Sequence, residues 1–306
     1  MDNPNVGKFA YVFPGQGSQW VGMGYDIYQN YAEAKAIFDE SDNALDFSVS
    51  QLCFQGPQEK LNRTDYAQPV ILTVSIAYLK ILSRVLQKDI PEPDMVTGHS
   101  LGEYTALVTA GVLDFRDVLR LVHIRGKLMQ RESEKIPSGM AAVIGLDKEI
   151  LEKICYETGA EIGNINSPGQ IVISGTKEAL AQAMELAKAK GALRAVPLNV
   201  AGAFHSKIMQ GAAGELSSCI SSLPFRNASI PIIANTSAQP ITDAAKIKHE
   251  LIQQLCHCVQ WQSSVAYMVQ NGVTNFIEIG PGNVLTGLIK RINREVQVTN
   301  VGCIPH

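Results

Sequence analysis

The sequence predicts an α/β protein in which a small unit interrupts a larger one. Short apolar runs bounded by glycine or proline alternate with helical patterns over most of the 306 residues. Between residues 139 and 200 the spacing of the predicted strands and helices changes. Here they follow the order βαββαβ, which is typical of a ferredoxin-like unit. We therefore expect a large α/β domain at residues 1–133 and 201–306, with a ferredoxin-like insert at residues 134–200.

The larger part is expected to contain short buried strands and longer helices. Pro14 and Gly15 stop the first strand, and Gly280 stops the last. The strands are expected at residues 9–13, 94–98, 230–234 and 275–279. Apolar spacing predicts helices at residues 67–86, 103–110 and about 117–131.

The insert carries its own start and stop signals. Asp147 is expected to cap a helix that runs to about residue 158, and Gly191 to close an alanine-rich helix at residues 176–190. Strands are expected at residues 139–146, 161–166, 170–174 and 193–200.

Composition narrows the class of protein. With 46% hydrophobic and 18% charged residues and a formal net charge of -3, the chain is expected to be globular and to bind neither nucleic acid nor an anionic membrane. The N-terminus lacks a signal-peptide pattern, and the longest apolar stretch, residues 70–82, is too short to span a bilayer. We expect a cytoplasmic protein that is a monomer.

The six cysteines are scattered and form no CxxC pair, which favours free thiols in a reducing compartment. The run Cys256-His257-Cys258 contains metal-ligand types. Because no second group of ligand residues is seen elsewhere in the sequence, this run makes a poor tetrahedral site, and no metal is expected there.

Residues 98–102 (GHSLG) match the G-x-S-x-G pattern and lie between a predicted strand and a predicted helix. In such a turn the serine adopts a strained backbone and exposes its hydroxyl, and the N–H of the next residue points toward a developing oxyanion. Ser100 is therefore the candidate nucleophile, and the Leu101 N–H a candidate oxyanion donor.

A serine nucleophile needs a base at neutral pH. His99 lies inside the turn, His123 lies in a predicted helix, and His249 and His306 lie in polar surroundings. His205 follows Ser100 in the chain and lies in a loop of small residues after a predicted strand. It is either the base or a hydrogen-bonded loop histidine.

The loop at residues 13–19 (FPGQGSQ) follows the first strand. It lacks the third glycine of a dinucleotide fingerprint and the lysine of a P-loop. A tight loop that offers a backbone N–H to the same oxyanion fits better, and Gln16 is the candidate donor.

Arg125 lies in the apolar stripe of its predicted helix. A buried guanidinium keeps its charge and is unfavourable without a partner. Either an internal acid pairs with it, or it awaits a substrate carboxylate that its planar fork can bind with two hydrogen bonds.

Together these motifs resemble the malonyl-CoA:acyl carrier protein transacylase family over nearly the whole chain. The matching segments are residues 12–19 (VFPGQGSQ), 98–103 (GHSLGE), 125 (R), 166–170 (NSPGQ), 204–205 (FH), 260–261 (QW) and 278–282 (EIGPG). The resemblance implies an α/β-hydrolase-like domain with a ferredoxin-like insert. Phe204 resembles the malonyl type, and Cys258 stands where the family usually has proline.

The resemblance also implies roles for individual residues. Ser100 would be the nucleophile and His205 the base, with the backbone carbonyl of Gln254 orienting the histidine. Arg125 would bind the malonyl carboxylate, and Asn166 would line the site. The oxyanion amides would be those of Gln16 and Leu101.

The reaction implied is a ping-pong transfer of malonyl from malonyl-CoA to the phosphopantetheine thiol of an acyl carrier protein, without metal or organic cofactor. Two alternatives stay open from the sequence. One is an acyl hydrolase of the editing type, which an uncharged residue at position 125 would favour. The other is a carrier-protein-binding module without catalytic activity.

Overall fold

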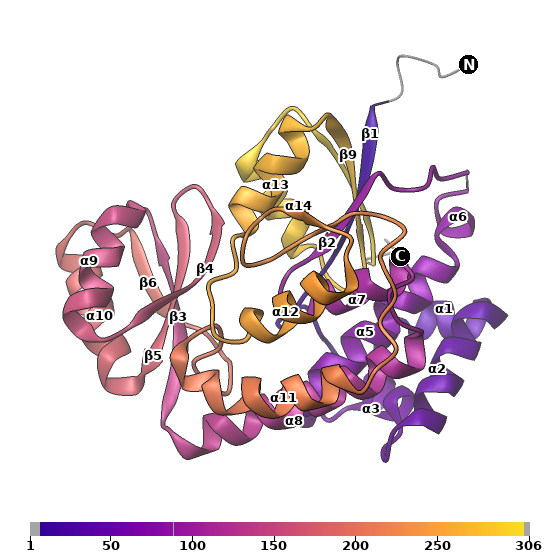
Figure 1. Cartoon of the computed structure of the whole chain (residues 1–306), viewed down its shortest axis with the longest axis horizontal. Coiled ribbons are helices and arrows are strands. Elements are labelled where there is room, and N and C mark those ends of the chain that lie inside the picture. The colour runs from indigo at the N-terminus through magenta and orange to yellow at the C-terminus, as the bar shows by residue number, and fades with distance from the viewer. Residues whose placement is uncertain (1–6, 88, 303–306) are drawn as a thin grey trace.

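The computed structural model describes residues 7–87 and 89–302 and has the α/β fold expected from the sequence (Figure 1). Two sheets form its framework. The larger has six strands in the order β10-β9-β1-β2-β7-β8, and the smaller has four in the order β4-β5-β3-β6. Each sheet has helices packed against it.

The larger sheet is parallel except for its edge strand β8. Strand β1 lies near its middle, between β2 and β9, and the residues of its second half are buried. Because parallel strands share a carboxyl edge, the loops after β1, β2, β7 and β9 gather on one side of the sheet. The strands are β1 (Lys8–Phe13), β2 (Met95–Gly98), β7 (Ile232–Ile233), β8 (Pro240–Ile241), β9 (Val273–Ile279) and β10 (Gln297–Val301).

Two expected elements of this part are shorter or divided in the structure. The strand expected at residues 230–234 is only β7, because Pro231 has no N–H to give to a strand ladder. The helix expected at residues 67–86 breaks at Ile81, whose backbone (φ -114, ψ 13) leaves the helical region between α5 and α6. Strands β8 and β10 carry no clear apolar pattern and were not expected.

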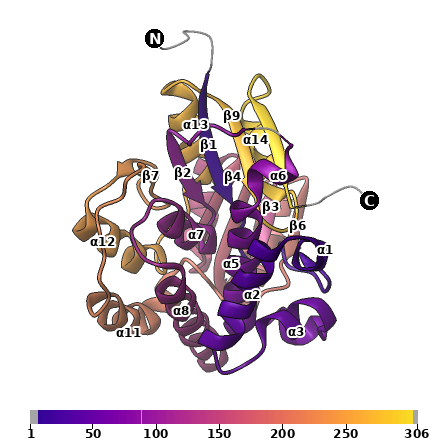
Figure 2. The same cartoon turned by 90° about the vertical axis from the view of Figure 1, so that its right-hand side faces the viewer.

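Helix α5 (Thr64–Lys80) is the central helix of the larger part, and fourteen of its residues are buried. It packs against α2, α7 and α8 (Figure 2). Helix α7 (Leu101–Thr109) follows β2, and α8 (Phe115–Lys135) carries Arg125. The other helices are α1 (Tyr25–Asn30), α2 (Ala32–Ala44), α3 (Val49–Gln55), α4 (Gln58–Leu61), α6 (Leu82–Val85), α11 (Gln210–Ser221), α12 (Ala244–Gln254), α13 (Trp261–Gln270) and α14 (Val284–Ile292), with the 3-10 turn η1 (Lys207–Met209).

The smaller sheet is antiparallel and follows the element order predicted from the sequence, although β6 ends at Pro197, earlier than expected. Helices α9 and α10 pack on it and enclose a separate apolar core (Figure 1). Its elements are β3 (Ser138–Ile144), α9 (Lys148–Thr158), β4 (Glu161–Ser167), β5 (Gln170–Thr176), α10 (Lys177–Ala189) and β6 (Arg194–Pro197).

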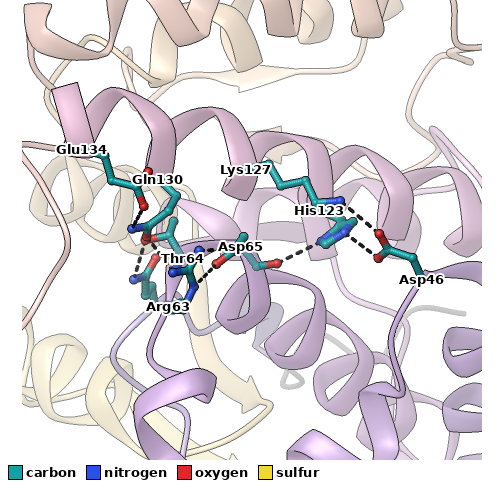
Figure 3. Close-up of polar contacts among 9 residues, drawn as sticks. Asp46, Arg63, Thr64, Asp65, His123, Lys127, Gln130 and Glu134 are labelled. Atoms are coloured by element: carbon teal, nitrogen blue, oxygen red, sulfur yellow. Dashed lines mark hydrogen bonds and ion pairs between the residues drawn. The ribbon is translucent and has the colours of Figure 1, made fainter.

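A polar cluster ties α8 to the start of α5 (Figure 3). His123, on α8, has its Nδ1 3.0 Å from the backbone oxygen of Asp65 and its Nε2 3.2 Å from the carboxylate of Asp46. The fork of Arg63 donates two bonds of 3.1 Å to the Asp65 carboxylate. The Thr64 N–H donates to the side chain of Gln130 at 3.4 Å.

Candidate active site

The turn from β2 into α7 has the geometry that the G-x-S-x-G pattern predicts. Ser100 has φ 52 and ψ -102, a strained conformation for a residue with a side chain. A Cβ on Gly98 would lie 2.0 Å from the backbone carbon of Gly102, and one on Gly102 would lie 2.0 Å from the backbone oxygen of Phe13. Both glycines are therefore required by the close approach of backbone to backbone.

His205 lies against the Ser100 hydroxyl. Its Nε2 is 2.9 Å from Ser100 Oγ, and its Nδ1 is 2.7 Å from the backbone oxygen of Gln254. A carbonyl can only accept, so Nδ1 carries the proton and Nε2 is free to accept from the hydroxyl. Cys258, where the resemblance implies a proline, leaves the Gln254 carbonyl in place for this bond.

The other described histidines have different surroundings. His99 has its Nε2 2.9 Å from Asn166 Oδ1, which turns the ring away from Ser100 and toward the smaller sheet. His123 belongs to the polar cluster of Figure 3. His249 and His257 lie at the surface, and His306 lies outside the described residues.

Arg125 is 1% exposed, as its place in the apolar stripe predicts. Its fork donates to the side-chain oxygen of Gln68 at 2.8 Å, to that of Gln254 at 2.9 Å and to Ser100 Oγ at 3.1 Å. All three acceptors are neutral, and the ring of Tyr104 lies 5.1 Å from the guanidinium carbon. Within residues 7–87 and 89–302, no carboxylate forms an ion pair with this guanidinium, so the site holds a buried cation directed at Ser100.

Gln254, the last residue of α12, joins these groups together. Its backbone oxygen holds His205, and its side-chain oxygen accepts from Arg125. Its side-chain nitrogen donates to the backbone oxygen of Ser100 at 2.9 Å and to the buried carboxyl of Glu103. The sequence suggested only the first of these contacts.

A cleft of about 390 Å³ lies between the two sheets beside this group. Gln16 and His99 line it from the larger part, and Asn164 and Asn166 from the smaller sheet. The Leu101 N–H is the first of helix α7, where an N–H has no acceptor within the helix. The roles expected for Gln16, Leu101 and Asn166 stay predictions, as do those of Ser100, His205, Arg125 and Gln254.

Comparison with known proteins decides the family. The acyl transferase domain family matches residues 10–304. The malonyl CoA-acyl carrier protein transacylase of Bacillus subtilis is 44% identical over 304 residues, which cover 97% of this chain and 94% of that protein. The chain belongs to the malonyl CoA-acyl carrier protein transacylase family. The enzyme of that name from Staphylococcus aureus (strain MRSA252) is 42% identical over 97% of this chain and 96% of that protein.

Solved structures agree with this family. An acyl carrier protein S-malonyltransferase from Vibrio cholerae is 42% identical with a TM-score of 0.91, covering 97% of both chains. A malonyl-transacylase in complex with a type II polyketide synthase acyl-carrier protein is 39% identical with a TM-score of 0.92, covering 97% of this chain and 96% of that one.

Burial and charge set the protonation state of His205. Burial lowers the pKa of His205, and the nearby Arg125 cation lowers it further, to about 3. Burial also lowers the pKa of Arg125, which nevertheless remains a cation at neutral pH. His205 is therefore neutral, the form that can take a proton from Ser100.

Several residues at the site were not foreseen as parts of it. Gln68 holds Arg125, and Tyr104 lies beside the guanidinium. Asn235 contacts the backbone on both sides of the elbow, and Glu103 contacts Asn235 and Gln254. Only Glu103 had a signal in the sequence, because it closes the segment at residues 98–103.

Proposed function

We propose that the chain transfers malonyl groups from malonyl-CoA to the phosphopantetheine thiol of an acyl carrier protein through an ester on Ser100. The observation that carries this proposal is Arg125, a buried guanidinium whose partners are all neutral and which lies 3.1 Å from Ser100 Oγ. A cation held there favours an acyl group that ends in a carboxylate. The names and complexes of the relatives support the same substrate and partner.

In the first half-reaction, Ser100 Oγ attacks the thioester carbonyl while its proton passes to His205 Nε2. The N–H groups of Gln16 and Leu101 receive the oxyanion of the tetrahedral intermediate. When the intermediate collapses, the carbon–sulfur bond breaks and the proton moves from His205 to the sulfur of the departing coenzyme A. The malonyl group is left as an ester on Ser100.

The malonyl carboxylate accepts hydrogen bonds from the guanidinium of Arg125. Ser100 Oγ loses the hydrogen bond from that guanidinium and keeps the one to His205. The carboxylate also offsets the positive charge that acts on His205, so the pKa of His205 rises when the substrate is bound and the base becomes stronger.

The second half-reaction reverses the first with a new thiol. His205 takes the proton from the phosphopantetheine sulfur, which attacks the ester carbonyl, and returns it to Ser100 Oγ as the ester bond breaks. Asn166 lines the cleft between the sheets, beside His99. None of these steps calls on a metal or an organic cofactor.

The hydrolase alternative differs in the acceptor, so the test follows the malonyl group. The protein is incubated with malonyl-CoA and a carrier protein with its phosphopantetheine, and malonyl-carrier and free malonate are separated by mass spectrometry. The control is the same carrier without phosphopantetheine. We expect malonyl-carrier as the main product and little malonate in the control.

Two other results would overturn the proposal. Malonate released at the same rate with either carrier would show a hydrolase that uses water as its acceptor. Unchanged malonyl-CoA, together with binding to the carrier protein, would show a module without catalytic activity.

A cytoplasmic location is part of the proposal. The cysteines at positions 53, 155, 219, 256 and 258 form no disulfide, as is usual in a reducing compartment. In the part of the chain that the structure describes, every helix is too short or too polar to cross a bilayer.

A further inference from the structure

We propose that Asn235 is a positioning residue that, together with Glu103, holds the backbone of Ser100 in its reactive conformation. The inference rests on the proposed function of Ser100 as nucleophile. It assigns a task to a residue that has no direct contact with the reacting hydroxyl.

The side chain of Asn235 bridges the two ends of the elbow. Its Oδ1 accepts the N–H of Ser100 at 2.7 Å, and its Nδ2 donates to the backbone oxygen of Gly98 at 2.8 Å. The two bonds use both ends of one planar amide, so they fix the distance and the angle between the strand end and the serine. Asn235 is 1% exposed, and water cannot take over these bonds.

The carbonyl of Ser100 is held in the same way from the other side. Gln254 Nε2 donates to it at 2.9 Å. Both backbone polar groups of the strained residue are therefore bound by amide side chains from elsewhere in the chain, at positions 235 and 254.

Glu103 connects the two amide residues. One of its carboxyl oxygens accepts the backbone N–H of Asn235 at 3.1 Å, and the other accepts Gln254 Nε2. Glu103 is 1% exposed and lies in the first turn of α7, the helix that begins directly after Ser100. It thus orients the two residues that hold Ser100.

The sheet explains why Asn235 lies at this place. Strand β7 is the parallel neighbour of β2, with Ile232 opposite Val96, and Thr97 Oγ1 donates to the backbone oxygen of Ile233 at 2.8 Å. Asn235 comes two residues after β7 at the shared carboxyl edge, where Ser100 comes two residues after β2. Its own backbone oxygen accepts the N–H of Gln260 at 2.7 Å, which fixes the loop.

A strained backbone conformation persists only when its surroundings over-determine it. Without the Asn235 amide, the Ser100 N–H would lose its acceptor, and the residue would relax toward an ordinary φ. Such relaxation would move Oγ relative to His205 Nε2 and to the oxyanion N–H groups. A displacement of about 1 Å at a reacting group can cost about a hundredfold in rate.

The test compares Asn235→Ala with Asn300→Ala in single-turnover acylation by malonyl-CoA. Asn300 is a matched control because its side chain, on the edge strand β10, also makes hydrogen bonds at the carboxyl edge of the larger sheet, to Glu278 and Gly282, three strands away from β2. We expect Asn235→Ala to lower the acylation rate constant about 10- to 100-fold. The half-saturating malonyl-CoA concentration should stay within about twofold, because Arg125 is intact.

Two further measurements separate positioning from a general loss of structure. Asn235→Ala and Asn300→Ala should lower the melting temperature by similar amounts. Only Asn235→Ala should lower the acylation rate constant. Modification of Ser100 by phenylmethylsulfonyl fluoride, which has no carboxylate for Arg125, should slow in parallel with acylation. If Asn235→Ala does not fold, Asn235→Ser takes its place, since a serine side chain is too short to bridge Ser100 and Gly98.

The outcomes distinguish the failure of this proposal from that of the proposed function. If the wild-type protein is not acylated on Ser100 at all, the proposed function fails. If the wild-type protein is acylated on Ser100 and the Asn235 variant reacts at the same rate, or loses only affinity for malonyl-CoA, then Asn235 is not a positioning residue.

Discussion

The two buried histidines of the larger part, His205 and His123, resemble each other and differ in one contact. Both are under one-tenth exposed, and both place Nδ1 against a backbone oxygen, that of Gln254 or of Asp65. The Nε2 of His205 faces the hydroxyl of Ser100, whereas that of His123 faces the carboxylate of Asp46. Figure 3 shows the second arrangement in full.

The comparison shows which neighbouring groups allow a buried imidazole to act as a base. His205 has a cation, Arg125, as its charged neighbour, which favours the neutral ring. His123 has the Asp46 carboxylate 3.2 Å from its Nε2 in place of a hydroxyl, and its cluster joins α8 to neighbouring segments. In the proposed mechanism the same backbone contact serves catalysis at His205 and packing at His123, and the group next to Nε2 decides which.

The largest expected difference comes from removing each ring. His205→Ala should lower acylation by about a hundredfold to ten-thousandfold, because serine is a poor nucleophile without a base. His123→Ala should acylate within about threefold of wild type and instead lose about 1–3 kcal/mol of stability, since it leaves the buried backbone oxygen of Asp65 without this partner. Single-turnover acylation and urea unfolding of both variants measure this. Similar rate losses in both would end the distinction between the two sites.

Arg125 should affect the choice of substrate. Arg125→Ala is expected to lower kcat/KM for malonyl-CoA about tenfold to a thousandfold, because a hydrogen bond to a charged group is worth about 1.5–3 kcal/mol and more in a dry site. Acetyl-CoA should react as before or better. Arg125→Lys should recover only part of the malonyl rate, since lysine lacks the planar fork.

Arg63→Ala, in the cluster of Figure 3, is the matched control for Arg125. It should leave the ratio of malonyl to acetyl rates unchanged. An equal loss for both substrates in Arg125→Ala would make that residue structural.

The smallest expected effect on the rate is that of pH. Because the pKa of His205 in the folded protein is about 3, lower than the ordinary 6.5, acylation at low substrate concentration should stay nearly constant down to about pH 5. The unfolded chain binds a proton near pH 6.5 and the folded chain does not. The stability contributed by the neutral ring is therefore full above pH 6.5 and is lost as pH falls from 6.5 toward 3.

As the pH falls from 7 to 4, wild type should therefore lose more stability than His205→Gln. Thermal melting of both proteins at a series of pH values measures this. A midpoint near pH 6.5 in the acylation profile would contradict the low pKa of His205.

The sequence was sufficient where a local pattern determined the structure. The elbow around Ser100 and the buried position of Arg125 follow from the spacing of glycines and of apolar residues. The strands at residues 9–13, 94–98 and 275–279 follow from short apolar runs, and the structure has them as β1, β2 and β9.

Contacts between distant segments could not be predicted in this way. Asn235 is separated from Ser100 by 135 residues, and Gln254 from Glu103 by 151. Buried amides such as Asn235 and Gln68 look like ordinary polar residues in a sequence, because their partners are set by strand order and helix packing. The partner of His205 was suggested by family resemblance, and its 2.7 Å bond to a carbonyl is visible only in three dimensions.

The most direct test of the central claim is to locate the acyl group. Wild-type protein and Ser100→Ala are mixed with malonyl-CoA in the absence of carrier protein, digested with a protease at low pH to preserve the ester, and analysed by tandem mass spectrometry. The proposal predicts one malonyl group per wild-type molecule, on the peptide that contains Ser100, and none on a folded Ser100→Ala protein. A malonyl group on any other residue, or stoichiometric labelling of the Ser100→Ala protein, would contradict it.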